Sequence, residues 1–160
     1  MTDLSRIVKA YDVRGVVPDQ LDARIAKALG AAFARFAGAP TVVVARDMRE
    51  SGVELSQAFA RGVTEAGVDV VDAGLGSTDL LYFAAGSMGV PGAMFTASHN
   101  PAEYNGIKLC LAGARPVGQD TGLAQVRADA ERFLDEGVPS TGSGTVIGRA
   151  SCRERVYGTV

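Results

Sequence analysis

The stretch that says most about the fold reads GAMFTASHNPAEYNGIKLCLA and spans residues 92–112. It begins with an apolar run of strand length, residues 92–97, and ends with a second one, residues 107–112. The segment between them, residues 98–106, is polar and finishes in an Asn-Gly pair that is typical of a turn. We therefore predict a hairpin of two strands joined by a polar loop.

Strand-like and helix-like runs alternate outward from this hairpin, which is the pattern of a layered α/β domain. The pattern predicts a three-layer α/β/α domain with a mixed, mostly parallel sheet that carries one antiparallel hairpin strand. The apolar run 41–45 is expected near the middle of that sheet. Two further strands are expected, at residues 7–14, ended by Gly15, and at 68–73. Helices are expected between Pro18 and Gly38 and at about 53–66, 80–87 and 120–136.

The composition fits one globular domain, which we assign to residues 1–137. A net charge of −2 gives no reason to expect nucleic acid or a membrane as a partner, and no apolar run approaches the roughly 20 residues of a membrane span. The N-terminus lacks the apolar centre of a signal peptide, so a cytoplasmic location is expected. The single histidine, His99, and the distant Cys110 and Cys152 argue against a zinc site or a disulfide framework.

The composition changes after Gly137 to Pro, Ser, Thr and Gly, and we interpret residues 138–160 as a linker or tail without a further element. Its segment IGRASCRERV, residues 147–156, resembles the translation of a common sequencing-adapter oligonucleotide. It is either a non-native read-through product, in which case Cys152 has no biological role, or a natural disordered linker.

The chemistry-bearing residues lie where the first strand of the hairpin ends, with Ser98, His99 and Asn100 in succession. Ligand sites in α/β domains are built at the ends of strands. The returning strand is expected to bring Lys108 to the same end of the sheet, so that a nucleophilic oxygen and a cation share one region.

Two other interpretations of Ser98 follow from the residues alone. A hydrolase triad with His99 as base is disfavoured, because neighbouring residues of an extended chain point in opposite directions and no GxSxG elbow is present. A simple polar turn is as well supported as a nucleophilic site, because Ser, Asn and Pro are ordinary turn residues.

Several further motifs stand in a fixed order around this loop and add up to a family resemblance. Over residues 7–136 the chain resembles the first domain of the α-D-phosphohexomutases, the phosphomannomutase/phosphoglucomutase family. The matching motifs are KAYDVRG at 9–15, RDMRES at 46–51, GVDVVDAG at 67–74 with LYF at 81–83, and TASHNP at 96–101 with YNGIK at 104–108.

The resemblance implies a phosphoryl relay. In that family the serine of the TASHNP loop carries a phosphoryl group, so Ser98 is expected to give its phosphoryl group to a hexose phosphate and to regain one from the resulting bisphosphate. By the same resemblance Lys108 is the expected general acid/base. Arg14 is expected to assist, and His99 to orient groups or to move protons. Such a reaction is served mainly by positioning and charge neutralisation.

The remaining implications concern ligands and partners. Tyr11 and Asn100 are expected to contact substrate or to support the loop. Mg²⁺ would bind Ser98 through its phosphate, with its other ligands in a second domain, and hexose 1,6-bisphosphate would act as activator. The family's Asp-rich metal loop does not occur in this sequence. The chain alone is therefore expected to be inactive, whereas its full-length parent would be an isomerase whose further domains pack against this one. The alternative is a non-catalytic phosphosugar-binding or scaffold module.

Some of these residues also have plainer structural interpretations. Arg14 could simply pair with Asp12. Asp47 and Arg49 are expected to fix a loop rather than to catalyse. The turn 74–79 is expected to cap a helix rather than to hold a phosphate, and it has Asp79 where the family usually has proline. Finally, we expect Cys110 and Met94 to belong to the core.

Overall fold

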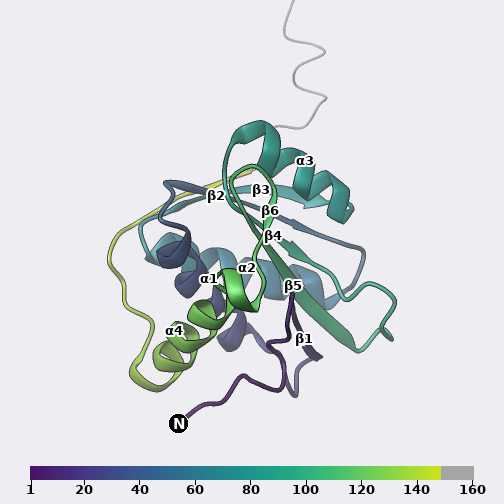
Figure 1. Ribbon diagram of the computed structural model, residues 1–160, viewed down its shortest axis with the longest axis vertical. Coiled ribbons are helices and arrows are strands. Elements are labelled where there is room, and N and C mark those ends of the chain that lie inside the picture. The colour runs from purple at the N-terminus through teal and green to yellow at the C-terminus, as the bar shows by residue number, and fades with distance from the viewer. Residues whose placement is uncertain (149–160) are drawn as a thin grey trace, which may run out of the picture.

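The computed structural model describes residues 1–148, which form a mixed sheet between two helical layers (Figure 1). The seven-stranded sheet has the order β1-β5-β4-β2-β3-β7, with β6 beside β5. Its strands are β1 (Val13–Val16), β2 (Thr41–Arg46), β3 (Asp69–Leu75), β4 (Gly92–Phe95), β5 (Tyr104–Leu111), β6 (Arg115–Pro116) and β7 (Val146–Ile147). The helices are α1 (Ala23–Ala37), α2 (Ser51–Glu65), α3 (Thr78–Met88), the 3₁₀ turn η1 (Gln119–Thr121) and α4 (Leu123–Glu136).

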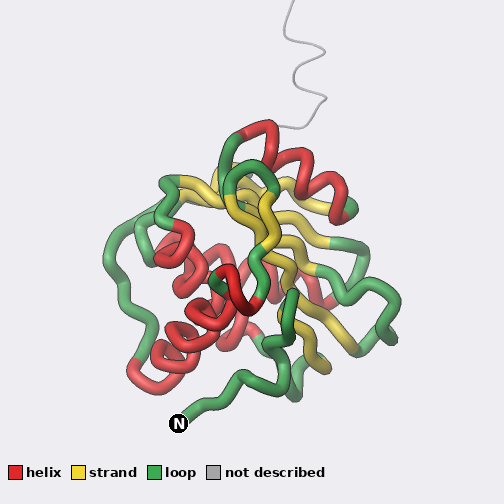
Figure 2. Tube along the Cα trace, viewed as in Figure 1, coloured by secondary structure: helices red, strands yellow, loops and turns green. Residues whose placement is uncertain are grey.

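The two faces of the sheet are covered unequally (Figure 2). Helices α1, α2 and α4 pack together on one face over the larger core, in which Phe33, Phe59 and Phe95 are fully buried. Helix α3 covers the other face over a smaller core that includes Leu81 and Met94. The predicted three-layer α/β/α architecture is thus confirmed, and β2 lies inside the sheet as expected.

Strand β5 is the one strand that runs against the others in the described part of the sheet. It pairs antiparallel with β1, β4 and β6, whereas β2 pairs parallel with β3 and β4, and β3 with β7. The predicted mostly parallel sheet with a single antiparallel hairpin strand is therefore confirmed. The hairpin joins β4 to β5 and leaves its connecting loop at the carboxyl edge of β4.

The helix ends follow the capping chemistry that the sequence indicates. The Asp22 side chain accepts a hydrogen bond from the Ile25 amide (2.8 Å) and caps α1, which ends at Gly38 in the left-handed conformation (φ 61°). Ser77 caps α3 in the same way by accepting from the Leu80 amide (3.1 Å). Since side-chain oxygens satisfy amides that the first turn leaves unpaired, these residues fix where the helices begin.

Two predicted elements are wrong in detail. Residues 7–14 do not form one strand, because the Lys9 amide bonds the carbonyl of Asp12 and the chain folds back into an isolated bridge between Val8 and Val13. The strand β1 consequently begins at Val13 and includes Gly15.

The Asn105-Gly106 pair is likewise not a turn and lies inside β5. A side chain at Gly106 would clash with the carbonyl oxygen of Val13 on β1. The glycine is needed there for close approach of two strands rather than for a chain reversal.

The segment that follows α4 packs against the domain. The Gly144 amide donates to the carbonyl of Thr64 (2.8 Å), and the Thr145 amide donates to the Asp69 carboxylate (2.8 Å). Strand β7 then adds to the open edge of β3, so the expectation of no further element after residue 137 is wrong. Residues 149–160, with Cys152 and most of the adapter-like segment, lie outside the described residues.

Within residues 1–148 no helix is long and apolar enough to cross a membrane. The cytoplasmic location stays a prediction.

Two glycine substitutions test this account of the sheet. Gly106→Ala should lower the free energy of unfolding by about 1–3 kcal/mol, because β1 and β5 must separate to admit a methyl group. Gly86→Ala on α3 is the matched control, since a side chain there meets nothing within 4 Å. It should raise the free energy of unfolding by about 0.5–1 kcal/mol. Urea unfolding of the chain and its variants measures both, and equal effects would contradict the account.

Candidate active site

The polar loop between β4 and β5, residues 96–104, is hereafter called the serine loop. The Ser98 backbone has φ 53°, a left-handed conformation that is uncommon for a residue other than glycine. The loop is closed internally, since the Ser98 amide donates to Oγ1 of Thr96 (3.1 Å) and the Asn100 amide to the carbonyl of Ala97 (3.0 Å). As a result the Ser98 and His99 side chains are exposed at the carboxyl edge of the sheet.

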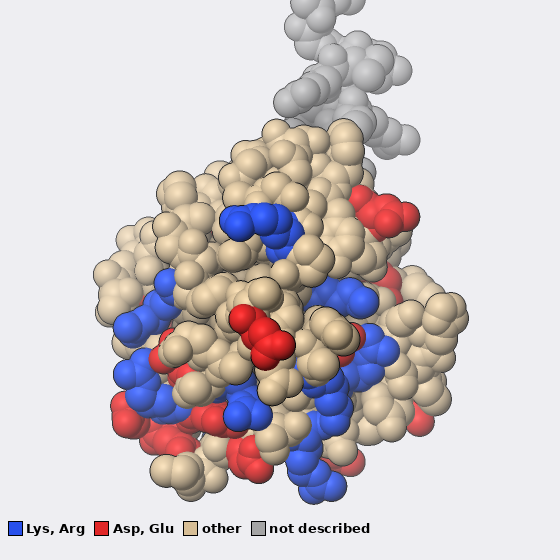
Figure 3. Space-filling model, viewed as in Figure 1, with Lys and Arg blue, Asp and Glu red and all other residues tan. Residues whose placement is uncertain are grey.

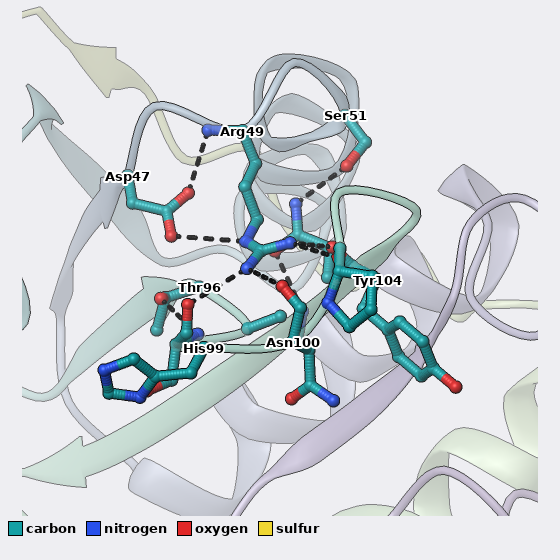
Figure 4. Close-up of polar contacts among 12 residues, drawn as sticks. Asp47, Arg49, Ser51, Thr96, His99, Asn100 and Tyr104 are labelled. Carbon is teal, nitrogen blue, oxygen red and sulfur yellow. Dashed lines mark hydrogen bonds and ion pairs between the residues drawn. The ribbon is translucent and has the colours of Figure 1, made fainter.

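The Arg49 guanidinium holds the serine loop from the side of β2 (Figure 4). Its two terminal nitrogens donate to carbonyl oxygens along the loop. These belong to Ser98 (3.0 Å), Asn100 (2.7 Å), Pro101 (2.7 Å) and Tyr104 (2.8 Å).

Asp47 in turn positions this arginine. Its carboxylate accepts the Arg49 backbone amide (3.0 Å) and lies 3.6 Å from Nε of the same residue. The Arg49 side chain is only 8% exposed, so water competes little for these contacts. The predicted loop-fixing role of Asp47 and Arg49 is confirmed.

Arg14 approaches the same loop from β1, on the other side. One terminal nitrogen donates to Oδ1 of Asn100 (2.5 Å) and to the carbonyl of Ala97 (3.2 Å). The other terminal nitrogen pairs with the Asp12 carboxylate (2.5 Å). The expected pairing with Asp12 is therefore present, and Arg14 additionally fixes Asn100, which was expected to support the loop or to contact substrate.

The His99 ring contacts the Ser98 hydroxyl, with Nδ1 at 3.0 Å from Oγ. The expectation that these neighbours point apart is wrong, because it assumed extended backbone and Ser98 is in the left-handed region. No carboxylate of residues 1–148 hydrogen-bonds the ring, so a third member that would orient His99 as in a hydrolase triad is lacking there.

Lys108 and Tyr11 are not brought into contact with Ser98. Lys108 lies in β5 opposite Met94, on the α3 face of the sheet, and its side chain makes no hydrogen bond or ion pair with any described residue. Tyr11 is 83% exposed. The structure thus brings Arg14, Asn100 and His99 together at the serine loop. The expected meeting of Lys108 with Ser98 stays a prediction, since Lys108 lies on the returning strand without a contact to that serine.

Sequence reasoning missed one contact that supports the loop. Asn105 is completely buried, and its Nδ2 donates to Oγ of Ser51 at the start of α2 (2.9 Å). The contact joins β5 to the helix that follows the Asp47–Arg49 turn. An Asn-Gly pair indicates a turn far more often than a buried amide, so no local signal pointed to it.

Other residues of interest are structural. The turn at 74–79 caps α3 through Ser77, as expected. Cys110 and Met94 are buried in the smaller core, and burial raises the pKa of the Cys110 thiol, which disfavours the reactive thiolate.

The described residues do not by themselves fit a magnesium site. Across residues 1–148 no group of three or more His, Cys, Asp or Glu side chains is placed to hold a metal ion. Near the serine loop the Asp47 carboxylate is engaged by Arg49. Mg²⁺ demands near-octahedral oxygen coordination, and a single serine oxygen, even when phosphorylated, does not supply it.

The layered domain with a polar, serine-bearing loop at its strand ends is of the α/β class that binds ligands at this edge. Residues 5–133 match the family described as phosphoglucomutase/phosphomannomutase, alpha/beta/alpha domain I. The chain belongs to this phosphoglucomutase/phosphomannomutase family.

Individual relatives show how much of the family protein this chain represents. This chain is 45% identical over 124 residues to a phosphomannomutase of Escherichia coli. The matched residues make up 77% of this chain and 27% of that protein. A phosphomannomutase of Klebsiella pneumoniae is 43% identical over 132 residues, or 82% of this chain and 83% of that one. A solved phosphoglucomutase/phosphomannomutase family protein of Burkholderia thailandensis has a TM-score of 0.77 at 39% identity, covering 98% of this chain and 35% of that chain. The chain thus spans about a quarter of the E. coli relative.

Arg49→Lys tests the loop contacts. An ammonium group cannot reach four carbonyls at once, so the free energy of unfolding should fall by about 2 kcal/mol, and amides of the serine loop should exchange faster with deuterium. The control is Arg132→Lys on α4, where a half-exposed arginine pairs with Asp129 and the expected change is within about 0.5 kcal/mol. Equal protection of the serine-loop amides from deuterium exchange in both variants would contradict the role given to Arg49.

Proposed function

We propose that this chain is the phosphoserine domain of a phosphohexomutase, an isomerase that moves a phosphoryl group between two hydroxyls of a hexose phosphate through Ser98. The observation that carries the proposal is the exposed serine hydroxyl in a left-handed backbone conformation, on a loop held by two arginines. Such strain persists only where surrounding contacts impose it, and it is common at active sites. Family membership supports the same reaction.

The proposed reaction has two transfers. In the first, the bond between phosphorus and Oγ of phosphorylated Ser98 breaks while a sugar hydroxyl forms a new bond to phosphorus. The sugar hydroxyl gives up its proton to a base, the leaving Oγ takes up a proton, and the product is a hexose bisphosphate. In the second, the Ser98 hydroxyl gives up its proton as Oγ takes the other phosphoryl group of the bisphosphate, and the sugar oxygen that leaves regains a proton. The serine ends phosphorylated, and the phosphate has moved on the sugar.

The proposed roles follow what each residue touches. His99 lies at hydrogen-bond distance from Oγ and is placed to accept or return the serine's proton. The Lys108 amine makes no hydrogen bond or ion pair with a described residue, so it is available to serve the sugar hydroxyl as general acid/base. The Arg14 guanidinium already hydrogen-bonds Asn100 and pairs with the Asp12 carboxylate, and we therefore propose that it positions the loop. Asn100 and Tyr11 remain proposed substrate contacts.

Magnesium and the activator belong to this proposal as well. Mg²⁺ would neutralise charge on the phosphoserine, with oxygen ligands from outside the described residues. Hexose 1,6-bisphosphate would charge the serine initially. We propose that the chain alone does not turn over hexose phosphates, because the side chains of residues 1–148 supply too few metal ligands. A non-catalytic module would instead leave Ser98 unphosphorylated.

A chimera tests the phosphoserine. Residues 5–133 would replace the matching segment of the E. coli phosphomannomutase, and intact mass would be measured after incubation with glucose 1,6-bisphosphate. We expect a gain of one phosphoryl group, its absence in Ser98→Ala, and its retention in the control Ser87→Ala, an exposed serine on α3. An adduct that survives Ser98→Ala would overturn the assignment.

The same chimera separates the two candidates for proton transfer. Lys108→Met should lower turnover by about 10²–10⁴-fold, as expected for loss of a general acid/base. Lys27→Met, which removes an ion pair with Glu65 between α1 and α2, is the control and should leave turnover unchanged. Full turnover in Lys108→Met together with its loss in His99→Gln would transfer the role to His99.

A further inference from the structure

The backbone conformation of Ser98 is set by the two peptide groups on either side of it, because their orientations define φ and ψ. In the peptide group that follows, the carbonyl of Ser98 accepts from Arg49 (3.0 Å). In the peptide group that precedes, the carbonyl of Ala97 accepts from the Asn100 amide (3.0 Å). The other polar atom of that preceding group, the Ser98 amide nitrogen, donates to the Thr96 hydroxyl (3.1 Å; Figure 4). Within residues 1–148 Thr96 is the residue that holds this amide.

Thr96 is itself firmly held, because it is tied to the sheet as well as to the serine loop. Its amide donates to the carbonyl of Gly106 in β5 (3.0 Å), and the residue is only 6% exposed. A β-branched side chain is stiff at χ1, so a buried threonine presents its hydroxyl in one direction. A hydroxyl that accepts the amide two residues ahead also forms a local turn. The Thr96 side chain therefore fixes the direction in which the chain leaves β4.

Loss of this hydroxyl would release the left-handed conformation of Ser98 (φ 53°). That conformation is disfavoured for a serine and persists only where contacts impose it. Water has little access to the position of the almost completely buried Thr96 side chain, so the Ser98 amide would keep no acceptor there. The amide finds a new partner only if the backbone turns toward solvent. The 3.0 Å contact between Oγ of Ser98 and Nδ1 of His99 depends on the original backbone and would be lost with it.

We propose that Thr96 is a positioning residue for phosphoryl transfer, whose hydroxyl holds the Ser98 amide and thereby aims the Ser98 hydroxyl and its contact with His99. The inference rests on the proposed function for the reaction, whereas the geometry that it invokes is independent of that function. Phosphoryl transfer is served mainly by positioning, and a small misplacement of the reacting oxygen lowers the rate strongly. Since Thr96 acts through Ser98, its loss should lower the rate of transfer and leave the affinity for the sugar phosphate nearly unchanged.

The geometry is tested by NMR on the 160-residue chain, in which His99 is the single histidine and gives unambiguous imidazole ¹⁵N signals. In Thr96→Val the Nδ1 resonance should move toward its position in Ser98→Ala, where the contact is absent. The Ser98 amide should also exchange with deuterium at least about tenfold faster. Thr96→Ser keeps the hydroxyl and should keep the Nδ1 resonance. The matched control Thr64→Val removes a hydroxyl that bonds the Arg61 carbonyl within α2, and it should change neither signal.

These substitutions leave every charge of the chain in place, which matters for the histidine signal. Figure 3 shows Lys and Arg side chains close to Asp and Glu side chains over one face of the domain. A change of charge on such a surface alters the electrostatic field at an exposed imidazole and shifts its resonances without any loss of contact. A shift in a neutral variant therefore reports the hydrogen bond.

The effect on the reaction is tested in the chimera that carries residues 5–133 in the E. coli phosphomannomutase. Phosphoryl uptake by the unphosphorylated chimera is followed at increasing concentrations of glucose 1,6-bisphosphate. Thr96→Val should lower the maximal rate by about tenfold or more, and the concentration at half the maximal rate should stay within about threefold. Thr96→Ser should keep the maximal rate within about threefold.

An unchanged Nδ1 resonance or an unchanged maximal rate in Thr96→Val overturns the proposal. An equal loss in Thr96→Ser or in Thr64→Val does so too, because the effect would then not belong to the Thr96 hydroxyl. Thr96→Ala removes the same hydroxyl without adding volume and replaces the valine variant if that variant does not fold. A chimera without substitution that takes up no phosphoryl group would instead contradict the proposed function, and the NMR result would still decide whether Thr96 positions Ser98.

Discussion

The Arg49 guanidinium, donating to carbonyl oxygens along the serine loop, is the interaction on which the candidate site depends. Carbonyls that all face one point repel each other unless a cation lies between them. Hydrogen bonds from a charged donor contribute about 1.5–3 kcal/mol each, more than neutral ones. A nearly buried arginine fixed by Asp47 therefore holds a backbone shape that Ser98 would not adopt unaided. The exposed hydroxyl and its contact with His99 follow from that shape.

The strand order explains why two arginines can reach one loop. The loop leaves β4 and returns in β5, and these strands lie between β2 on one side and β1 on the other. Arg49 follows β2 and Arg14 lies in β1, so the chain supplies a cation from each flank although the two residues are far apart in sequence. This arrangement depends on the antiparallel direction of β5. If β5 were parallel to β4, the chain would cross over and β5 would begin at the opposite edge of the sheet.

Much of this could be predicted from the sequence because the signals are local. Apolar runs predicted the strands of the sheet core, and Gly38 and the turn 74–79 indicated helix ends. What failed needed tertiary information. The Asn105-Gly106 pair has the sequence of a turn, but a buried amide contact and the close approach of β1 place it within a strand. The contact of His99 with Ser98 depends on a backbone conformation that neighbouring arginines impose, and no residue pattern encodes it. The hollow of about 600 Å³ beside the serine loop likewise joins residues from the N-terminal segment, β1 and the serine loop only after folding.

The central claim is that this loop presents Ser98, and no other hydroxyl, as a phosphoryl carrier. Tandem mass spectrometry of the tryptic peptide covering residues 62–108 tests it most directly, because this peptide also contains Ser77 and Ser87 as internal comparisons. After exposure of the chimera to glucose 1,6-bisphosphate, the account predicts fragment ions that place the phosphoryl group on Ser98 alone. A phosphoryl group on Ser77 or Ser87, or a peptide that stays unmodified, would contradict it.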